Sequence, residues 1–286
     1  MAEFPVAVIT DEFSQDLEQV CKTAADLGVP GLEIRTAWDK NIVDMTDDEV
    51  RDIRRLADAS RLQVISIASP VYKCTHPSSG DIDHRFEQDA FQSAHTWEDQ
   101  PRILARAVQI ARMLGAQILR VFSFWRSVEP THMHDAIVDA LREAVQAASP
   151  AGVHIGLENE HACNLATGAE VAPVLKAVPE QAFGVVWDPA NAYVSGVKPF
   201  PDDYRNLPPD RILHVHAKDG VMHDDRMEWD EVGRGKVNWK GQLEALNKDG
   251  YQGMISLETH WGGPGGDKFQ GSVQCVKALQ KLIDKA

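Results

Sequence analysis

The chain has 286 residues, of which 43% are hydrophobic and 25% are charged, and its formal net charge is −14 at pH 7. These proportions are those of a soluble globular protein, and no apolar run approaches the ~20 residues that cross a bilayer, so we do not expect a membrane protein. The acidic balance disfavours a nucleic-acid partner, because phosphate backbones would be repelled.

Short runs rich in β-branched residues recur along the chain, and each is followed by a segment with apolar residues at three- and four-residue spacing. The eight predicted strands are Val6–Thr10, Gly31–Arg35, Gln63–Ser69, Gln117–Ser123, His154–Glu160, Phe183–Asp188, Ile212–Lys218 and Gly253–His260. Eight strand–helix pairs are typical of a (β/α)8 TIM barrel, which fills ~250 residues as one domain. We therefore predict one α/β barrel domain over residues 1–286.

Helix boundaries are also visible in the sequence. A stripe that starts at Leu17 predicts the first helix, with Gly28 as its stop signal. Two capping boxes, at residues 46–49 and 167–170, predict the starts of the second and fifth helices. Four prolines interrupt residues 195–210, so only a short helical piece is expected there. The first strand–helix turn lacks the glycine-rich dinucleotide fingerprint, which favours a closed barrel over an open sheet.

Ionisable residues end four successive predicted strands: Glu158, Asp188, His216 and Glu258. Because barrel active sites lie where strands end, we expect these side chains to converge. Three carboxylates and one imidazole would repel one another and shift their pKa values unless a cation neutralised them. This ligand set suits Mn²⁺, Mg²⁺, Co²⁺ or Zn²⁺.

Two further interpretations concern the same strand ends. Gly156 and Ser256 share strand faces with the two glutamates, and such small residues are expected to leave room for a bound ligand. The alternative to metal binding is a structural ion network in which the carboxylates pair with bases such as Arg120, Lys73 or Lys218.

At these positions the chain resembles the xylose isomerase-like TIM barrels, also called AP endonuclease family 2, of the sugar-phosphate isomerase and epimerase type. The likeness spans nearly the whole chain. The matching segments are Ile-Gly-Leu-Glu158-Asn-Glu, Val-Trp-Asp188-Pro-Ala-Asn191, His214-Val-His216-Ala-Lys218-Asp219, Gly-Tyr251-Gln-Gly and Ile-Ser-Leu-Glu258-Thr-His260. The resemblance implies the same four metal ligands: Glu158, Asp188, His216 and Glu258. His214 is expected to be a core residue rather than a competing ligand.

The implied function is that of a divalent-metal-dependent isomerase or epimerase that acts on a keto-sugar or related polyol through a metal-stabilised enediolate. Glu158 and Glu258 are the candidate acid/base pair, and Mn²⁺ is the expected ion, with Mg²⁺, Co²⁺ and Zn²⁺ as alternatives. The residues expected to contact substrate are Lys73, Arg120, Glu160, His161, Asn191, Lys218 and His260. Aromatic rings that could stack on a sugar are Trp38, Phe122, Trp125, Trp187 and Trp261, with core packing as the alternative for all five and above all for Trp187.

Rival functions remain open on the same scaffold. A metal-dependent lyase, acting as a keto-sugar or inosose dehydratase or a 3-keto-glycoside deglycosidase, would use Glu160, His161 or His260 to protonate the leaving group. Ketose 3-epimerases carry a His where this chain has Asn191 and an Arg where it has Met222, so that specific activity is not predicted. The acidic balance argues against an abasic-site endonuclease, and the two intact glutamates argue against a sugar-binding protein without catalytic activity.

The remaining expectations concern location and partners. The four cysteines lie far apart, and the N-terminal segment lacks the basic start of a signal peptide, which predicts reduced thiols and a cytoplasmic location. The expected partner is a small carbohydrate, with no nucleic acid and no membrane, and homo-oligomerisation is left open.

Overall fold

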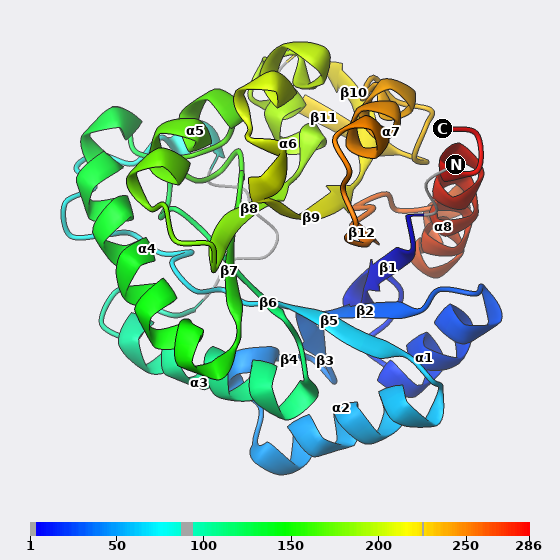
Figure 1. The fold of residues 1–286 in the computed structure, drawn as a ribbon. Helices are drawn as coiled ribbons and strands as arrows, with labels where there is room; N and C mark the ends of the chain where they lie inside the picture. Colours follow the sequence, from blue (N-terminus) through cyan, green and yellow to red (C-terminus); the bar gives the residue numbers. More distant parts are fainter. Residues whose placement is uncertain (1–3, 87–93, 225) are drawn as a thin grey trace.

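The computed structural model describes residues 4–86, 94–224 and 226–286. Within these residues, eight parallel strands form a closed barrel (Figure 1). They are β1 (Val6–Ile9), β2 (Gly31–Ile34), β5 (Gln63–Ala68), β6 (Ile118–Val121), β7 (His154–Glu158), β8 (Phe183–Trp187), β9 (Ile212–Ala217) and β12 (Ile255–Leu257). The barrel closes where β1 pairs with β12, for example through Val8 and Leu257. The predicted (β/α)8 barrel is confirmed.

Most predicted strands extend past the observed ones at their carboxyl ends. The last strand was predicted to run to His260, but its ladder ends at Leu257. Asp188 and Glu258 each follow the last residue of their strand, although the amide of Glu258 still donates to the carbonyl of Ala217 at 3.0 Å. The residues with functional chemistry therefore sit at the rim.

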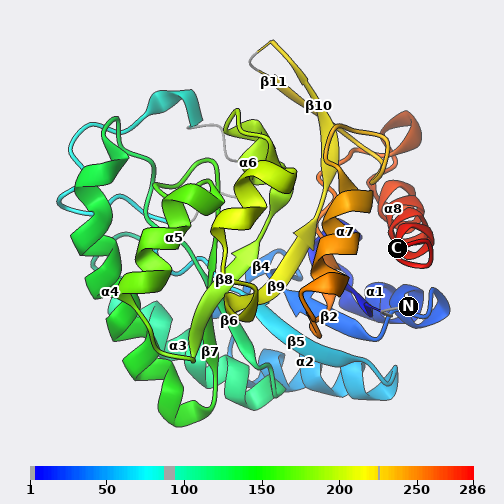
Figure 2. The same cartoon turned by 45° about the horizontal axis from the view of Figure 1, so that its top comes forward.

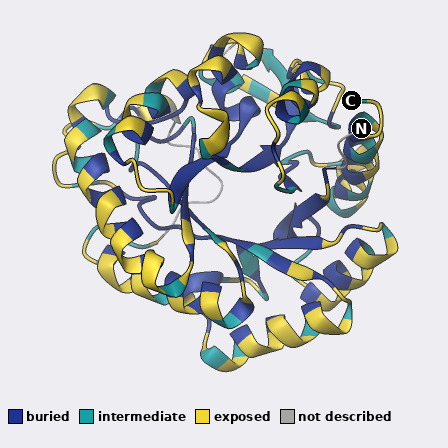
Figure 3. Ribbon diagram, in the orientation of Figure 1, coloured by how far each residue is buried: buried dark blue, intermediate teal, exposed yellow. Residues whose placement is uncertain are grey.

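The α-helices lie around the barrel with their exposed faces outward (Figure 3). They are α1 (Leu17–Asp26), α2 (Asp47–Ala59), α3 (Gln100–Leu114), α4 (His134–Ala148), α5 (Gly168–Ala177), α6 (Pro189–Val194), α7 (Trp239–Lys248) and α8 (Lys268–Ile283). Helix α2 is typical: Val50, Ile53 and Ala57 are buried on its inner face. This stripe attaches the helix to the barrel by apolar burial.

The predicted helix signals are found at the expected places. Thr46 and Thr167 each form a complete capping box with the glutamate three residues later. Gly28 adopts a left-handed φ of +69° after α1, a conformation that glycine adopts without strain. The sixth helix is short and lies directly after β8, ahead of the proline-rich segment, which forms short turns over Pro199–Asp203, Tyr204–Asn206 and Pro209–Arg211.

Two antiparallel hairpins that were not predicted interrupt the βα pattern. One consists of β3 (Thr36–Ala37) and β4 (Lys40–Asn41) after β2, and the other of β10 (Asp219–His223) and β11 (Arg226–Asp230) after β9. The β10–β11 hairpin projects beyond the barrel (Figure 2). Both follow the carboxyl ends of barrel strands, on the side where barrel enzymes place their loops.

The two ends of the described chain lie close to each other beside α8 (Figures 1 and 2). Among the described residues, every helix is too short or too polar to span a bilayer.

Candidate metal centre and substrate pocket

The four predicted ligands come together at the carboxyl end of the barrel. Glu158 ends β7, Asp188 follows β8, His216 lies in β9 and Glu258 follows β12. One potential ligand atom from each lies within 4.8 Å of the others, and all four residues are buried. The convergence expected from four successive strand ends is present.

Each carboxylate in this cluster has one oxygen held by the scaffold. Glu158 Oε2 accepts from Arg120 Nη1 at 2.9 Å, and Glu258 Oε1 accepts from Arg35 Nη1 at 2.8 Å. Asp188 Oδ1 caps helix α6 by accepting from two backbone amides, those of residues 190 and 191 at 2.8 and 3.0 Å. The second oxygen of each carboxylate is thereby left to the centre of the cluster.

Positive charge inside the cluster comes from Lys218 and His216. Lys218 Nζ lies 2.9 Å from Asp188 Oδ2 and 3.0 Å from Glu258 Oε2. His216 Nδ1 lies 3.2 Å from Glu158 Oε1 and 3.4 Å from Glu258 Oε2. The ion network weighed as an alternative therefore exists for Arg120 and Lys218, and the ammonium of Lys218 contacts the centre-facing oxygens of Asp188 and Glu258.

The pKa values follow from these contacts. Burial raises the pKa of Asp188. Burial alone would also raise the pKa of Glu258, but the charge of Lys218 and hydrogen bonds from His216 and His260 outweigh it and hold that pKa well below its usual value. Burial would lower the pKa of His216, whereas the charges of Glu33 and Glu158 raise it well above its usual value. The centre thus favours bound positive charge.

These residues fit a divalent cation. Three carboxylate oxygens and one imidazole nitrogen are the donor set that Mg²⁺, Mn²⁺, Co²⁺ and Zn²⁺ accept, and the set does not choose among them. Asp188 Oδ2 is fully buried and accepts no hydrogen bond from the described residues, since Lys218 approaches it only as an ion pair. A buried carboxylate oxygen that meets only a cationic group can also serve as a ligand of a bound ion.

Two neighbouring groups share residues with this cluster but do not offer a second site. In the first, Glu33 Oε2 lies 3.1 Å from the Nε2 atoms of both His214 and His216, so hydrogen bonds already use these atoms. His214 is 1% exposed, in keeping with its predicted core role. In the second group, of Glu12, Glu258 and His260, the guanidinium of Arg35 already binds both carboxylates.

A polar pocket of about 380 Å³ opens beside the cluster, near the lower end of the volumes that small-molecule sites have. Five of the predicted substrate residues line it together with Glu258: Lys73, Arg120, Glu160, His161 and His260. Phe122 adds an apolar surface, with Lys73 Nζ 4.7 Å and the Arg120 guanidinium 4.4 Å from its ring centre. The pocket can therefore contact both the hydroxyl groups and the C–H face of a sugar.

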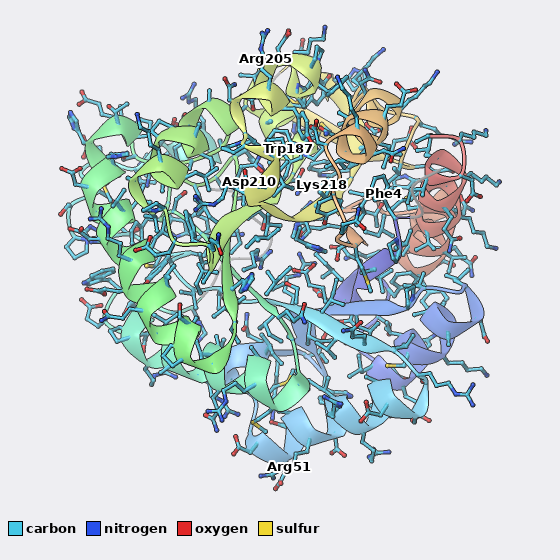
Figure 4. The ribbon with its side chains drawn as sticks, in the orientation of Figure 1. Phe4, Arg51, Trp187, Arg205, Asp210 and Lys218 are labelled. Carbon is cyan, nitrogen blue, oxygen red and sulfur yellow. The ribbon has the colours of Figure 1, made fainter. Side chains whose placement is uncertain are left out.

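Asn191 and Lys218, also predicted to contact substrate, lie behind the ligands rather than in the pocket wall. Asn191 Nδ2 donates to the backbone carbonyl of Asn159 at 2.9 Å and to Glu158 Oε1 at 3.3 Å. Lys218 is fully buried, and Figure 4 places it toward the barrel interior, in contrast to Arg51 on the outer surface. In this structure, both side chains support the ligands.

Comparison with known proteins identifies the family. The model of the xylose isomerase-like TIM barrels matches residues 21–279. The chain belongs to this family. Among solved structures, this xylose isomerase-like barrel is similar to the IOLI protein with a bound zinc atom, with a TM-score of 0.76 and 18% identity over 98% of both chains. It is also similar to the D-psicose 3-epimerase of Clostridium cellulolyticum H10 solved with D-tagatose, with a TM-score of 0.67 and 14% identity over 98% of this chain and 97% of that chain.

Because the sequence identities to these two solved structures are only 18% and 14%, the similarity shows a shared fold. A curated relative, an uncharacterised protein of Methanocaldococcus jannaschii, is 32% identical over 123 residues, which are 42% of this chain and 41% of the relative. This xylose isomerase-like barrel thus spans less than half of the length of that relative, whose description names no activity.

The sequence pattern missed several pocket residues from the first two strands. Asp11 and Arg35 line the pocket and bind each other, with Arg35 Nε donating to Asp11 Oδ2 at 2.9 Å. Arg35 directly follows β2, so the strand-end criterion applied to the last four strands would have found it. Asp39 lines the pocket from the turn of the β3–β4 hairpin, where Trp38 and Asp39 have φ values of +53° and +59°. That turn has no glycine and gave no signal.

One expectation about small residues is wrong. A Cβ atom at Gly156 would lie 2.7 Å from Val186 Cγ2 and 3.2 Å from Ile118 Cγ2. The glycine therefore makes room for its neighbours in the barrel interior, not for a bound ligand. Trp187 is likewise a core residue: it is fully buried and donates from Nε1 to Gln242 Oε1 at 2.9 Å.

Proposed function

We propose that this protein is a divalent-metal-dependent isomerase or epimerase of a keto-sugar or related polyol. The observation that carries the proposal is the convergence of Glu158, Asp188, His216 and Glu258 beside a polar pocket. Each of the three carboxylates is fixed through one oxygen and offers the other to the same point. The similarity in fold to the D-psicose 3-epimerase supports the proposal by analogy.

A divalent cation, when bound, would stabilise the negative charge that develops on a substrate oxygen while the adjacent C–H loses its proton. Glu258 is the better placed of the two candidate bases, because it lines the pocket. Glu158 is 1% exposed and is restrained by Arg120. In an epimerisation it would exchange a proton with the opposite face of the same carbon.

The other pocket residues orient the substrate. Glu160 forms an ion pair with His161 at 2.8 Å, and Asn191 stands within hydrogen-bonding distance of both. Arg35 holds Glu258 in place through Nη1 while its other nitrogens bind the carboxylates of residues 11 and 12. Such fixed carboxylates and imidazoles can accept and donate hydrogen bonds to several hydroxyl groups at once.

A specific observation also favours the lyase alternative. His161 and His260 both line the pocket that contains Glu258. Burial would lower the pKa of His161, but the charge of Glu160 raises it above its usual value, which favours the protonated form that could act as an acid. Isomerisation and elimination would begin with the same proton abstraction and differ in the next step.

One experiment tests both functions. Purified protein is analysed for bound metal and then incubated in D₂O, with added Mn²⁺, Mg²⁺, Co²⁺ or Zn²⁺, with ketoses, keto-glycosides and inososes. We expect deuterium to enter a substrate carbon, and we expect Glu258→Gln to lower this exchange by about 10²–10⁴-fold. Glu158→Gln is the parallel variant for the second proton transfer.

The products separate the two functions. Exchange with an isomerised or epimerised sugar supports the isomerase, whereas loss of water or of an alcohol supports the lyase. Protein that exchanges no deuterium with any of the four ions would contradict both.

A further inference from the structure

The three carboxylates of the metal cluster are each held through the atom that does not face the centre. His216 has an equivalent restraint. Its Nδ1 faces Glu158 and Glu258, while its Nε2 lies 3.1 Å from Glu33 Oε2 on the opposite side of the ring. Glu33 lies in β2, which pairs with β1 and β5 and with none of the strands that position the four predicted ligands, and neither function above gives it a role.

The surroundings of Glu33 fix its carboxylate firmly. The side chain is fully buried and does not line the pocket. Its Oε1 accepts from Ser66 Oγ at 3.0 Å, and its Oε2 lies 3.1 Å from Nε2 of both His214 and His216. A buried carboxylate held by three partners from β5 and β9 is a rigid acceptor.

We propose that Glu33 is a positioning residue that holds His216 in the Nε2–H form and directs Nδ1 to the metal. The proposal rests on the metal binding proposed above. A carboxylate that accepts from one ring nitrogen fixes the tautomer and the ring orientation, and it leaves the lone pair of the other nitrogen for a cation.

The same contact accounts for the second histidine of the His214–Val215–His216 segment. His214 directs its Nε2 at the same oxygen of Glu33 and at Ser256 Oγ, 2.8 Å away. Its ring is nearly perpendicular to that of His216, with the ring centres 5.4 Å apart. One carboxylate oxygen thus binds two neighbouring histidines, and only His216 also reaches the cluster.

The test measures binding of Mn²⁺ alone, by calorimetry, to the wild-type protein and three variants. Glu33→Ala removes the acceptor, and we expect the dissociation constant to rise by about 10–100-fold, the usual effect of losing such a partner. Glu33→Gln keeps an acceptor oxygen for the histidines, because the Ser66 hydroxyl can rotate to accept from the new amide, so it should recover part of the affinity. Ser66→Ala is the matched control, since it removes a hydrogen bond from Glu33 but not from His216.

A direct readout on the wild-type protein covers the case in which Glu33→Ala does not fold. In ¹⁵N spectra of the Zn²⁺-loaded protein, His216 should carry its proton on Nε2 and bind the ion through Nδ1. An ion bound through Nε2, or a Glu33→Ala variant that binds Mn²⁺ as tightly as wild type, would overturn the role of Glu33 while leaving the proposed function standing. Wild-type protein that binds neither ion would overturn both.

Discussion

At the scale of single residues, the candidate site consists of charged side chains that each bind more than one charged neighbour. Arg35 is the clearest case, because its guanidinium binds Asp11, Glu12 and Glu258 while only 5% of the residue is exposed. Removing one member of such a buried network leaves the others without compensation, which costs more than the network contributes as a whole. Changes at Arg35 should therefore affect both folding and the orientation of Glu258.

The carboxylate of Glu12 should make the protein sensitive to acid. Burial would raise the pKa of Glu12, but the charges of Arg35, His260 and Lys268 outweigh it and lower that pKa from 4.5 to about 2. Between these values the unfolded chain binds a proton that the folded protein does not, so the free energy of unfolding falls as the pH falls from 4.5 toward 2. Urea unfolding at pH 5 and pH 3 measures this loss.

The matched variant is Glu12→Gln, which cannot titrate. It should be less stable than wild type at pH 5, and its further loss between pH 5 and pH 3 should be smaller. Equal losses in the two proteins would assign the acid sensitivity to other groups.

Some functional residues could be predicted from the sequence and others could not. The four ligands end apolar strands, so an ionisable residue there was conspicuous in the sequence. Glu33 was missed because its role depends on hydrogen bonds with side chains of β5 and β9. Contacts of this kind join residues far apart in the sequence, so local sequence patterns do not predict them.

At the scale of elements, helices were easier to predict than hairpins. The capping boxes that start α2 and α5 use side chains only three residues apart, so the sequence contains the whole motif. The β3–β4 hairpin turns through Trp38 and Asp39, and Asp224, at φ +52°, lies between β10 and β11. These are not the Asn-Gly or Gly-rich turns that reveal a hairpin, so both insertions escaped prediction.

The cap of α2 should contribute measurably to stability. Thr46 Oγ1 accepts from the amide of Glu49 at 3.3 Å, and Glu49 Oε2 accepts from the amide of Thr46 at 2.8 Å. Thr46→Ala should lower the free energy of unfolding by about 1 kcal/mol, measured by urea unfolding at neutral pH. Thr23→Ala, inside α1, is the control, because alanine is favoured in a helix interior. Equal effects in the two variants would contradict the role of the cap.

At the scale of the whole molecule, the site joins the two halves of the barrel. The four candidate ligands come from the last four strands, β7 to β12, whereas Glu33, Arg35 and Arg120, which hold three of them, come from β2 and β6 or directly follow them. The eight-strand pattern was predictable because every strand and helix repeats the same periodicity. The pairing of the two halves around the cluster depends on closure of the barrel, which no segment reveals alone.

A bound cation should therefore stabilise the entire fold. In the proposed site, saturating Mn²⁺ binds only the folded state, so thermal unfolding should occur at a higher temperature than in EDTA. Without a bound cation, Lys218 offsets part of the negative charge of Asp188 and Glu258. The Lys218→Met variant should therefore unfold at a lower temperature than wild type in EDTA, and Mn²⁺ should raise its unfolding temperature by more than it raises that of wild type. Lys240→Met, which alters an exposed 3.9 Å pair with Glu244, is the control. Equal gains in wild type and Lys218→Met would contradict this account.

The pairing of β1 with β12 also has a consequence for biosynthesis. On the ribosome, the first strand emerges long before the strand that must lie beside it, and Glu258 follows that last strand. A nascent chain can therefore fold its early helices and strands against one another, but it cannot assemble all four candidate ligands until the eighth strand has been made. Any metal that this protein uses would be acquired late in synthesis or after it, from the ions available to the completed barrel.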